Sequence, residues 1–419
     1  MGSPTHQGPQ AIPKARLGTL QPSPRAATGL ANAEAQPHER HVISVVLPCL
    51  NEAGSVGRVV AEVLRALAEL GLDGEVLVAD NGSTDDSVAE ARAAGARVVI
   101  EPRRGYGFAY HGGIAAAHGD WIVMADADGT YDLSADGLRR LLGPLADGTA
   151  EMVVGNRFAG GLPARAMPWS HRYIGNPLLS GILRLLFGSP VRDAHCGLRA
   201  FTRQVYDRLR LRTGGMEYAS EMIVRASQLG VPVAEIPVAY RPRVGTSKLR
   251  TVPDGWRHLC LMLLYSPTHL FVYPGLALLA VGLVVLLALA PGPIEVAGLP
   301  FDYHVMFVGS LAFLIGIQAL SLGFIARVYA VVEGFGREDS LLRWFLHAVT
   351  MQRAMLLGAL LVAIGLTLNL GVVVIWASHG FANLNALRPA LVALTFTVAG
   401  INLGLSALFI SALLLPRLR

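Results

Sequence analysis

The stretch DWIVMADADG (Asp120–Gly129) is the strongest single indication of fold and function in the first half of the chain. An apolar run typical of a buried strand leads directly into Asp126 and Asp128, which only Ala127 separates. We predict a strand over Asp120–Asp128 with both acidic residues at its C-terminal end. If the strand end bends, both carboxylates can reach one ligand, and hard oxygen ligands of this kind suit Mg²⁺ or Mn²⁺. Such an ion would bridge a diphosphate, although acidic pairs at strand ends also serve simply as loop caps.

Short apolar runs alternate with segments of helical periodicity on the N-terminal side of this stretch. Strands are expected at Val42–Leu50, Glu75–Asp80 and Ala96–Ile100, and helices at Ser55–Leu70, Asp86–Gly95 and Tyr110–Gly119. This alternation predicts an α/β domain with a parallel sheet. Ligands bind beyond the carboxyl ends of the strands in such sheets, and the polar clusters Asn51–Glu52 and Asp80–Ser83 fall there.

The segment that follows, from Glu151 to about Lys248, mixes both kinds of element. Strands are predicted at Met152–Phe158 and Val233–Tyr240, and an amphipathic helix at His171–Gly188. A further amphipathic helix is expected over about Thr251–Leu264. Its Trp, Arg and His residues among leucines are typical of a helix that lies on a membrane surface.

Four long apolar runs occupy the rest of the chain, at roughly Leu270–Ala290, Val305–Val332, Met355–Ala377 and Leu391–Leu415. Each reaches the roughly 20 residues that a membrane-spanning helix needs. Buried helices of a large soluble domain are the less favoured alternative, because the runs carry so few charges. Basic residues gather in the loop between the second and third runs and in the tail: Arg337, Arg343, Arg353, Arg417 and Arg419. By the positive-inside rule, this loop, the tail and the head lie in the cytoplasm.

Composition agrees with a membrane protein. The 419 residues are 53% hydrophobic and only 16% charged, whereas about 25% charged residues is usual in soluble domains. The net charge of +5 does not indicate nucleic-acid binding, because the arginines scatter through the head and flank apolar runs. Three cysteines without metal-ligand spacing argue against a disulfide framework. The predicted organisation is a disordered extension (1–40), an α/β head (41–250), an interfacial helix (251–268) and four transmembrane helices (269–419).

Two loops beside the acidic pair add to the predicted site. VADNGSTDDS (Val78–Ser87) follows a strand and opens a helix, so Asp80 could accept hydrogen bonds from a base or ribose. The alternative is an N-cap with turn chemistry that uses Ser83, Thr84 or Asp85, and the two roles can coexist. PRRGYGFAY (Pro102–Tyr110) is a glycine-rich basic loop before a helix, a pattern suited to phosphates.

Taken together, these segments resemble family-two glycosyltransferases with the GT-A fold. The resemblance is closer to the polyprenyl-phosphate branch, which includes dolichol-phosphate mannose synthases and bacterial polyprenyl-phosphate glucosyltransferases. It covers about Val42–Leu249, and transmembrane helices after the head also suit the branch. The matching pieces run in family order: LPCLNE, ADNGSTD, RGYGFAYHGG, DADG, VGNRFAGG, DAHCGLRAF, MEYASEM and RPRVGTSKL.

The resemblance implies roles for individual residues. Donor-binding residues would be Pro48, Asn51, Glu52, Asp80, Asn81, Gly82, Gly105, Asp126, Ala127 and Asp128. Asp126 and Asp128 would also hold the Mg²⁺ or Mn²⁺ ion. The acceptor phosphate would be bound by Arg157, Arg172, Asn176, Arg243, Ser247 and Lys248. The basic residues could also have roles other than binding the acceptor phosphate. Arg172 could be a solvated surface residue, and Arg243 and Lys248 could anchor the chain to lipid headgroups.

The implied reaction is single-step inverting transfer of glucose or mannose from UDP-glucose or GDP-mannose to a polyprenyl phosphate. A phosphate nucleophile is largely dianionic near neutrality, because its second pKa is about 6, so it needs no strong base. Asp128, Asp193 and Arg157 are the catalytic candidates. Glu217 and Glu221 are further acidic candidates for orienting sugar or phosphate. Asp193 could instead pair with Arg192 or Arg199.

One position departs from the family pattern, and two other functions stay open. Many members carry Gln where this chain has Thr130, so Thr130, Asp132 or water would complete the metal shell, or Asp132 would cap the next helix. One rival function is a family-two synthase with a hydroxyl acceptor, although the segment before the first span lacks a Gln-x-x-Arg-Trp motif. The other is a transporter with a nucleotide-sugar-sensing head. Association of the chain with itself is also left open.

Overall fold

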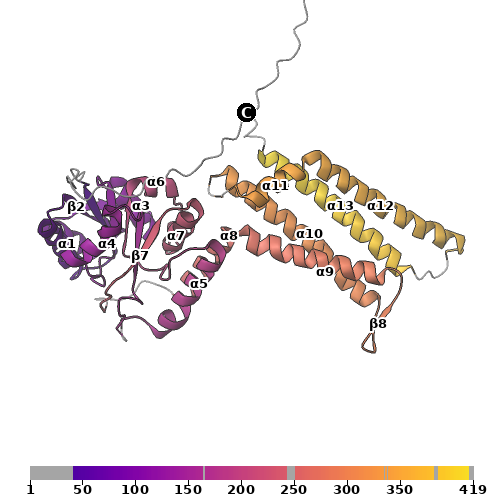
Figure 1. Cartoon of the computed structure of the whole chain (residues 1–419), viewed down its shortest axis with the longest axis horizontal. Coiled ribbons are helices and arrows are strands. Elements are labelled where there is room, and N and C mark those ends of the chain that lie inside the picture. The colour runs from indigo at the N-terminus through magenta and orange to yellow at the C-terminus, as the bar shows by residue number, and fades with distance from the viewer. Residues whose placement is uncertain are drawn as a thin grey trace, which may run out of the picture. The chain divides into compact units, whose positions relative to one another are not determined.

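A computed structural model describes residues 41–163, 166–242, 251–334, 336, 338–381 and 386–414. The predicted N-terminal extension and the predicted phosphate-binding residues Arg243, Ser247 and Lys248 lie outside these residues. The described chain contains a head built on a seven-stranded sheet, followed by a group of long helices (Figure 1).

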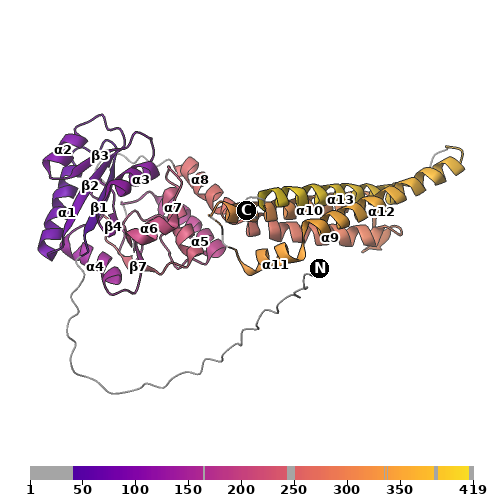
Figure 2. The same ribbon diagram turned by 90° about the horizontal axis from the view of Figure 1, so that it is seen from above.

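The sheet of the head has the strand order β3-β2-β1-β4-β6-β5-β7. Its strands are β1 (Ile43–Cys49), β2 (Gly74–Asp80), β3 (Arg97–Ile100), β4 (Trp121–Met124), β5 (Met152–Asn156), β6 (Arg199–Thr202) and β7 (Val233–Pro237). Strand β1 lies between two parallel neighbours, with Val46 opposite Leu77 on one side and Met124 on the other. Figure 2 shows β3, β2, β1 and β4 side by side.

The prediction of a parallel sheet was wrong for one strand. Strand β6 runs antiparallel to both β4 and β5. It has only four residues, and one of them is Arg199, so it has no apolar run that would mark it in the sequence. Arg199 is fully buried because its guanidinium donates to three backbone carbonyls, at Cys196, Ala219 and Ala194.

The helices of the head form two packed groups. One group contains α1 (Val56–Leu70), α2 (Ser87–Ala93) and α4 (Ala135–Ala146). The other contains α3 (Tyr106–Ala116), η1 (His171–Gly175), α5 (Asn176–Phe187), α6 (Arg203–Leu209), α7 (Tyr218–Leu229) and α8 (Thr251–Leu264). The predicted amphipathic helices at 171–188 and 251–264 are confirmed as helices.

Two predicted element boundaries near the acidic pair were wrong. Strand β4 ends at Met124 rather than Asp128, and the chain turns at residues 127–128, where the Asp128 carboxylate accepts the backbone N–H of Thr130. Helix α3 begins at Tyr106 rather than Tyr110, directly after Gly105. Gly105 has φ +147°, a conformation that a residue with a side chain rarely adopts.

Among the described residues of the second half, four helices are long and apolar enough to cross a membrane, as predicted. They span Thr268–Leu289, Tyr303–Val332, Met351–Ser378 and Leu387–Leu414. The first combines η2 (Thr268–Val272) with α9 (Tyr273–Leu289), and the others are α10, α12 and α13. They pack in a row in the order α9, α10, α13, α12 (Figure 1). The hairpin β8 (Ile294–Val296) and β9 (Leu299–Phe301) follows α9, and α11 (Ser340–Ala348) follows α10.

Glycines let neighbouring helices of this row approach closely. A Cβ atom on Gly282 of α9 would lie 2.4 Å from the backbone nitrogen of Phe313 on α10. A Cβ atom on Gly365 of α12 would lie 2.2 Å from Oγ1 of Thr397 on α13. Small residues at such contacts are typical of membrane helices, which associate through close backbone packing rather than a hydrophobic driving force.

Candidate active site

The predicted polar clusters meet at one edge of the sheet. Strands β2, β1 and β4 are adjacent and parallel, so their carboxyl ends lie side by side. The loops that follow them begin at Asn81, Leu50 and Ala125. The structure therefore brings Asn51, Asp80 and the Asp126–Asp128 turn to the same edge, as the sequence indicated.

Hydrogen bonds hold the first two loops to each other. Asn51 has φ +54°, and its Oδ1 accepts the backbone N–H of Thr84 at 2.8 Å. The backbone N–H of Asn51 donates to Oγ of Ser83 at 3.0 Å. The backbone N–H of Glu52 donates to Oγ of Ser87 at 2.8 Å. The sequence could not show these bonds, because they join residues more than 30 positions apart.

Asp80 and Asn81 at the end of β2 are both buried and both organise loops. The Asp80 carboxylate accepts the backbone N–H groups of Gly82, at 3.1 Å, and Ser83, at 3.2 Å. Of the residues named for the alternative role, Asp85 accepts the N–H of Ser87, the first residue of α2, at 3.1 Å. Asn81 donates to the carbonyls of Glu101 and Arg103 and accepts the N–H of Gly105 at 2.7 Å. Asn81 therefore fixes the glycine-rich loop against the end of β2.

The glycine-rich loop is also held from its other side by backbone contact. A Cβ atom on Gly105 would lie 2.2 Å from the carbonyl oxygen of Gly214, and one on Gly107 would lie 2.5 Å from that of Thr213. Glycine is required at both positions because the two backbones touch. The Arg103 guanidinium binds Glu101 at 2.8 Å, whereas that of Arg104 lies over Gly82.

Different contacts orient the two aspartates of the turn. Oδ1 of Asp126 accepts a hydrogen bond from the Tyr106 hydroxyl at 3.3 Å. Burial and the Asp126 charge raise the pKa of Tyr106 well above its ordinary value, so the phenol keeps its proton. Asp126 also lies against Gly197, where a Cβ atom would be 2.8 Å from Oδ2. Asp128 is buried, and its Oδ1 accepts the backbone N–H of Thr130 at 3.0 Å and its hydroxyl at 2.7 Å.

These contacts bear on how a metal would be held. Thr130 is fully buried with its hydroxyl on Asp128, and Asp132 forms an ion pair with Arg241 at 3.1 Å. Helix α4 is capped by Ser134, not Asp132. Within the described ranges, no group of three or more His, Cys, Asp or Glu side chains could hold a metal ion. Two carboxylates fit a divalent ion whose remaining ligands are diphosphate oxygens and water.

Arg157 and Asp193 form a buried ion pair beside this turn. Nε of Arg157 is 2.8 Å from one Asp193 oxygen and Nη2 is 2.7 Å from the other, and the Arg157 backbone N–H also donates to Asp193. Burial opposes the charged form of Arg157, but the coulombic attraction and the hydrogen bonds of Asp193 together with smaller contributions outweigh it, so the pKa of Arg157 lies well above its ordinary value. Asp193 thus pairs with Arg157, not with Arg192 or Arg199. Such bidentate pairs fix the guanidinium plane.

The Arg157 charge acts on the same aromatic residues as the two aspartates. The Arg157 guanidinium lies 5.4 Å from the centre of the Tyr240 ring. The pKa of Tyr240 is raised chiefly by burial; the positive charge of Arg157 opposes this rise, and the negative charges of Asp126 and Asp128 add to it. The Tyr240 ring lies 5.4 Å from the Tyr131 ring, and the Tyr131 hydroxyl accepts the backbone N–H of Gly197, against which Asp126 lies.

The predicted acceptor residues on η1 and α5 make local contacts. Arg172 donates to the carbonyl of Pro163 at 3.0 Å, and its guanidinium is 5.4 Å from the Tyr173 ring centre. Asn176 donates to the Met167 sulfur at 3.3 Å. Large apolar side chains around them are exposed: Trp169, Tyr173, Ile174, Leu178 and Leu185.

The two acidic candidates of MEYASEM differ in their surroundings. Glu221 is fully buried and accepts hydrogen bonds from the N–H groups of Arg212 and Thr213, the Thr213 hydroxyl and the Tyr265 hydroxyl. It therefore has a structural role. Oε2 of Glu217 is buried and accepts no hydrogen bond from any residue that the structure describes.

Tyr106 and Gly197, which both contact Asp126, were not predicted as site residues. The prediction considered the glycines and arginines of the segment at 102–110 and the charged residues of the segment at 192–201.

Comparisons with known proteins agree with this geometry. Residues 44–210 match the model of glycosyl transferase family 2, and residues 324–414 match that of the glycosyltransferase family 2 C-terminal transmembrane region. The low-salt glycan biosynthesis hexosyltransferase Agl6 of Haloferax volcanii is 36% identical over 373 residues, which cover 89% of this chain and 88% of that relative. The chain belongs to glycosyltransferase family 2.

Other similar proteins cover mainly the head of this glycosyltransferase. The dolichyl-phosphate hexose transferase of Haloferax volcanii is 31% identical over 214 residues, covering 51% of this chain and 89% of that protein. A solved structure of glucosyl-3-phosphoglycerate synthase from Mycobacterium tuberculosis, with Mn²⁺, UDP-glucose and phosphoglyceric acid, is 28% identical. It covers 54% of this chain and 79% of that one, with a TM-score of 0.42.

Proposed function

We propose that this glycosyltransferase moves a hexose from a nucleotide diphosphate sugar to a polyprenyl phosphate, with inversion at the anomeric carbon. The observation that carries the proposal is the Arg157–Asp193 pair, which Tyr240, Tyr131 and Gly197 connect through successive contacts to Asp126. Asp193 fixes the plane of the Arg157 guanidinium, which we expect to contact a second phosphate that approaches the donor. The name of the Haloferax dolichyl-phosphate hexose transferase supports the same acceptor class.

The main requirement of this reaction is that the protein neutralises the negative charges of the donor diphosphate and the acceptor phosphate. An oxygen of the acceptor phosphate forms the new bond to the anomeric carbon, while the bond to the diphosphate oxygen breaks and its electron pair leaves with the nucleoside diphosphate. Asp126 and Asp128 would hold Mg²⁺ or Mn²⁺, which when bound supplies neutralisation of the leaving diphosphate. Thr130 and Tyr106 orient these carboxylates. Arg157, oriented by Asp193, offsets the acceptor charge.

One observation favours a second candidate function, transfer to a hydroxyl acceptor. A hydroxyl nucleophile needs a general base, and Oε2 of Glu217, which accepts no hydrogen bond from the described residues, is a carboxylate oxygen of the kind that serves as one. A phosphate acceptor needs no such base. The two candidates therefore predict different acceptors for the same site.

A donor and acceptor screen separates the candidates. Membranes containing the full chain are given radiolabelled UDP-glucose, GDP-mannose or a UDP-N-acetyl sugar, with either polyprenyl phosphate or the unphosphorylated polyprenol. We expect a label in the lipid extract with one hexose donor and only with the phosphate. Equal labelling of the polyprenol would overturn the proposal in favour of the hydroxyl acceptor.

We also propose that the head lies on the cytoplasmic side of the membrane. The basic side chains of Arg343 on α11 and Arg353 in the first turn of α12 support this orientation through the positive-inside rule. Protease added to intact bacterial cells should leave the head uncut, whereas lysis should expose it. Cleavage of the head in intact cells would contradict this orientation.

A further inference from the structure

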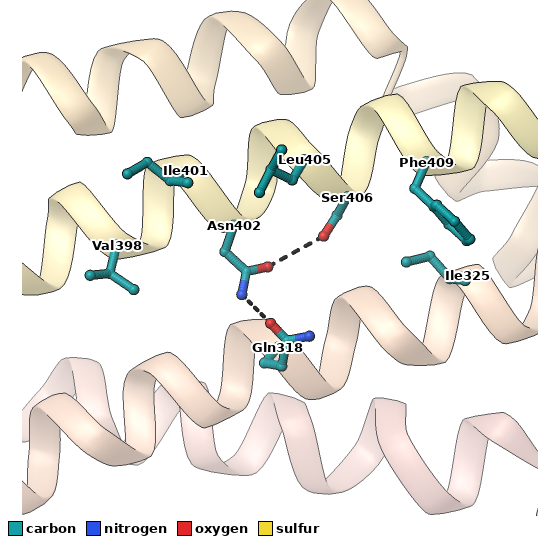
Figure 3. A pocket seen from close by; sticks show the side chains of 8 residues that line it. All are labelled: Gln318, Ile325, Val398, Ile401, Asn402, Leu405, Ser406 and Phe409. Carbon is teal, nitrogen blue, oxygen red and sulfur yellow. Dashed lines mark hydrogen bonds between the residues drawn. The ribbon is translucent and has the colours of Figure 1, made fainter.

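The membrane-spanning helices carry a groove between α10 and α13, drawn in Figure 3. Its volume is about 470 Å³. Ile325, Leu405 and Phe409 contribute apolar walls, while Gln318, Asn402 and Ser406 place polar groups along it. Helices α10 and α13 are the two inner helices of the row, so the groove lies on a broad side of that row.

The polar groups of the groove form a short network. Nδ2 of Asn402 donates to Oε1 of Gln318. Oδ1 of Asn402 accepts hydrogen bonds from Ser406, at 3.3 Å, and Ser321, at 3.5 Å. The Gln318 side chain is exposed, and its Nε2 donates to no residue that the structure describes. Both N–H bonds of the Gln318 side-chain amide are therefore without an acceptor among the described residues and lie on the exposed side of α10.

These N–H bonds would lie near the middle of a bilayer that the helices cross. Gln318 is midway along α10 (Tyr303–Val332), and Asn402 is near the middle of α13 (Leu387–Leu414). There is no water at that depth to accept hydrogen bonds, and an unpaired polar group there is costly. Hydrocarbon chains offer no acceptor oxygen. The occupant of the groove must therefore bring an acceptor at the depth of Gln318.

We propose that the occupant is a second copy of this chain, inserted in the same orientation. Two parallel copies related by a two-fold axis along the membrane normal place identical residues at the same depth. A primary amide is both donor and acceptor, and Oε1 of Gln318 has a second lone pair besides the one engaged by Asn402. The two Gln318 amides then bond reciprocally, and the apolar walls pack around them.

The fraction of each span that is already buried leaves room for such a contact. In α10, only 28% of the most apolar 18-residue stretch is buried by the rest of the chain, and in α13 the corresponding share is 17%. A single row of helices has two broad sides. Lipid covers apolar side chains on such a side without cost, so the polar network is what distinguishes the groove from the rest of that surface.

Subunit counting in bilayers tests the proposal. The full chain, labelled with one fluorophore per copy, is reconstituted in phosphatidylcholine vesicles at low protein density, and photobleaching steps are counted. We expect mostly two-step traces for the wild type. Gln318→Leu should raise the dissociation constant at least about fivefold, because interhelical hydrogen bonds contribute measurably to membrane-helix association.

A matched substitution tests whether association depends on the groove itself or on any polar side chain in the membrane helices. Asn369 is a polar residue of α12 that does not line the groove, and Asn369→Leu should leave the two-step fraction unchanged. Single-step traces for the wild type at all densities would overturn the proposal and assign the groove to lipid or another protein. A loss of two-step traces in Asn369→Leu but not in Gln318→Leu would overturn it as well.

Cross-linking tests the same contact with Gln318 intact. In a chain whose Cys260 is replaced by Ser, Leu405→Cys places a thiol on a groove wall and Leu356→Cys places one on the outer helix α12; both positions are exposed. Residues near a two-fold axis meet their own copies, so oxidation in membranes should join Leu405→Cys chains. Equal cross-linking at position 356, or none at 405, would contradict the groove contact.

Discussion

The head and the membrane helices hold themselves together in contrasting ways. In the head, Arg157, Asp193, Arg199 and Glu221 are charged and buried, and each is held by hydrogen bonds to side chains or backbone. In the membrane helices, the closest contacts are made by glycines such as Gly282 and Gly365. The head therefore depends on the polarity of its side chains, and the membrane region depends on their size. A substitution that changes only the polarity of a side chain should therefore affect the head most, and one that changes only its size should affect the membrane helices most.

The largest effect is expected at the acidic pair. Asp128→Asn keeps the size of the side chain and removes its charge, so it should lower hexosyl transfer at least about a hundredfold, the scale on which charge-stabilising groups act in active sites. Steady-state rates of purified variants at saturating Mg²⁺ provide the measurement. Asp136→Asn, an exposed carboxylate of α4, serves as the control and should retain full activity. Full activity of Asp128→Asn would remove Asp128 from the site.

The next effect concerns the stability of the head. Asp193→Asn leaves the Arg157 charge buried without its partner, so unfolding should become easier by about 3–5 kcal/mol. Intrinsic fluorescence melting of the full chain in detergent measures this change. Asp136→Asn also breaks an ion pair, with Arg140, but both side chains are more than half exposed, and the change should stay below about 1 kcal/mol. Similar melting temperatures for the two variants would contradict the dependence on polarity.

A smaller effect is expected from size in the membrane region. Gly365→Leu forces a side chain into the contact with Thr397 and should destabilise the α12–α13 pair by about 1–3 kcal/mol. Gly371→Leu is the matched control on the same helix, since a Cβ atom there would meet nothing within 4 Å. Melting monitored by size-exclusion chromatography should separate the two variants. Equal losses would show that glycine contacts do not set the packing of these helices.

The smallest predicted effect is a pH dependence in the head. Burial lowers the pKa of His258 from 6.5 to about 4. The unfolded chain therefore binds a proton below pH 6.5 that the folded chain does not, so this contribution to stability is complete above pH 6.5 and is lost as pH falls toward 4. At pH 5.5 the loss should be about 1 kcal/mol.

A variant isolates that contribution from the titration of carboxylates. His258→Gln should show a smaller drop in melting temperature between pH 7.5 and 5.5 than the wild type. His118→Gln, at an exposed histidine, should behave like the wild type. An unchanged pH response in His258→Gln would show that His258 does not carry the effect.

Sequence patterns predicted the features that depend on neighbouring residues. Strand β1 and the four spans follow from the lengths of local apolar runs, helix α1 follows from helical periodicity, and the acidic pair follows from its position after an apolar run. The partner of Asp193 could not be predicted, because Arg157 is 36 positions away and the sequence offers nearer arginines at 192 and 199. Strand β6 was missed because its direction is set by its neighbours β4 and β5, not by its own four residues.

Helix α8 has a practical consequence for separating the head from the membrane. Met262 of α8 is fully buried in the core of the head, His258 donates to or accepts from Ser220 at 2.8 Å, and Tyr265 donates to Glu221 at 2.7 Å. A head expressed alone and cut at residue 250 would expose that core and remove one donor from a buried carboxylate. The useful cut lies after Ser266, and a water-soluble enzyme prepared this way would retain every hydrogen bond of Glu221 described above.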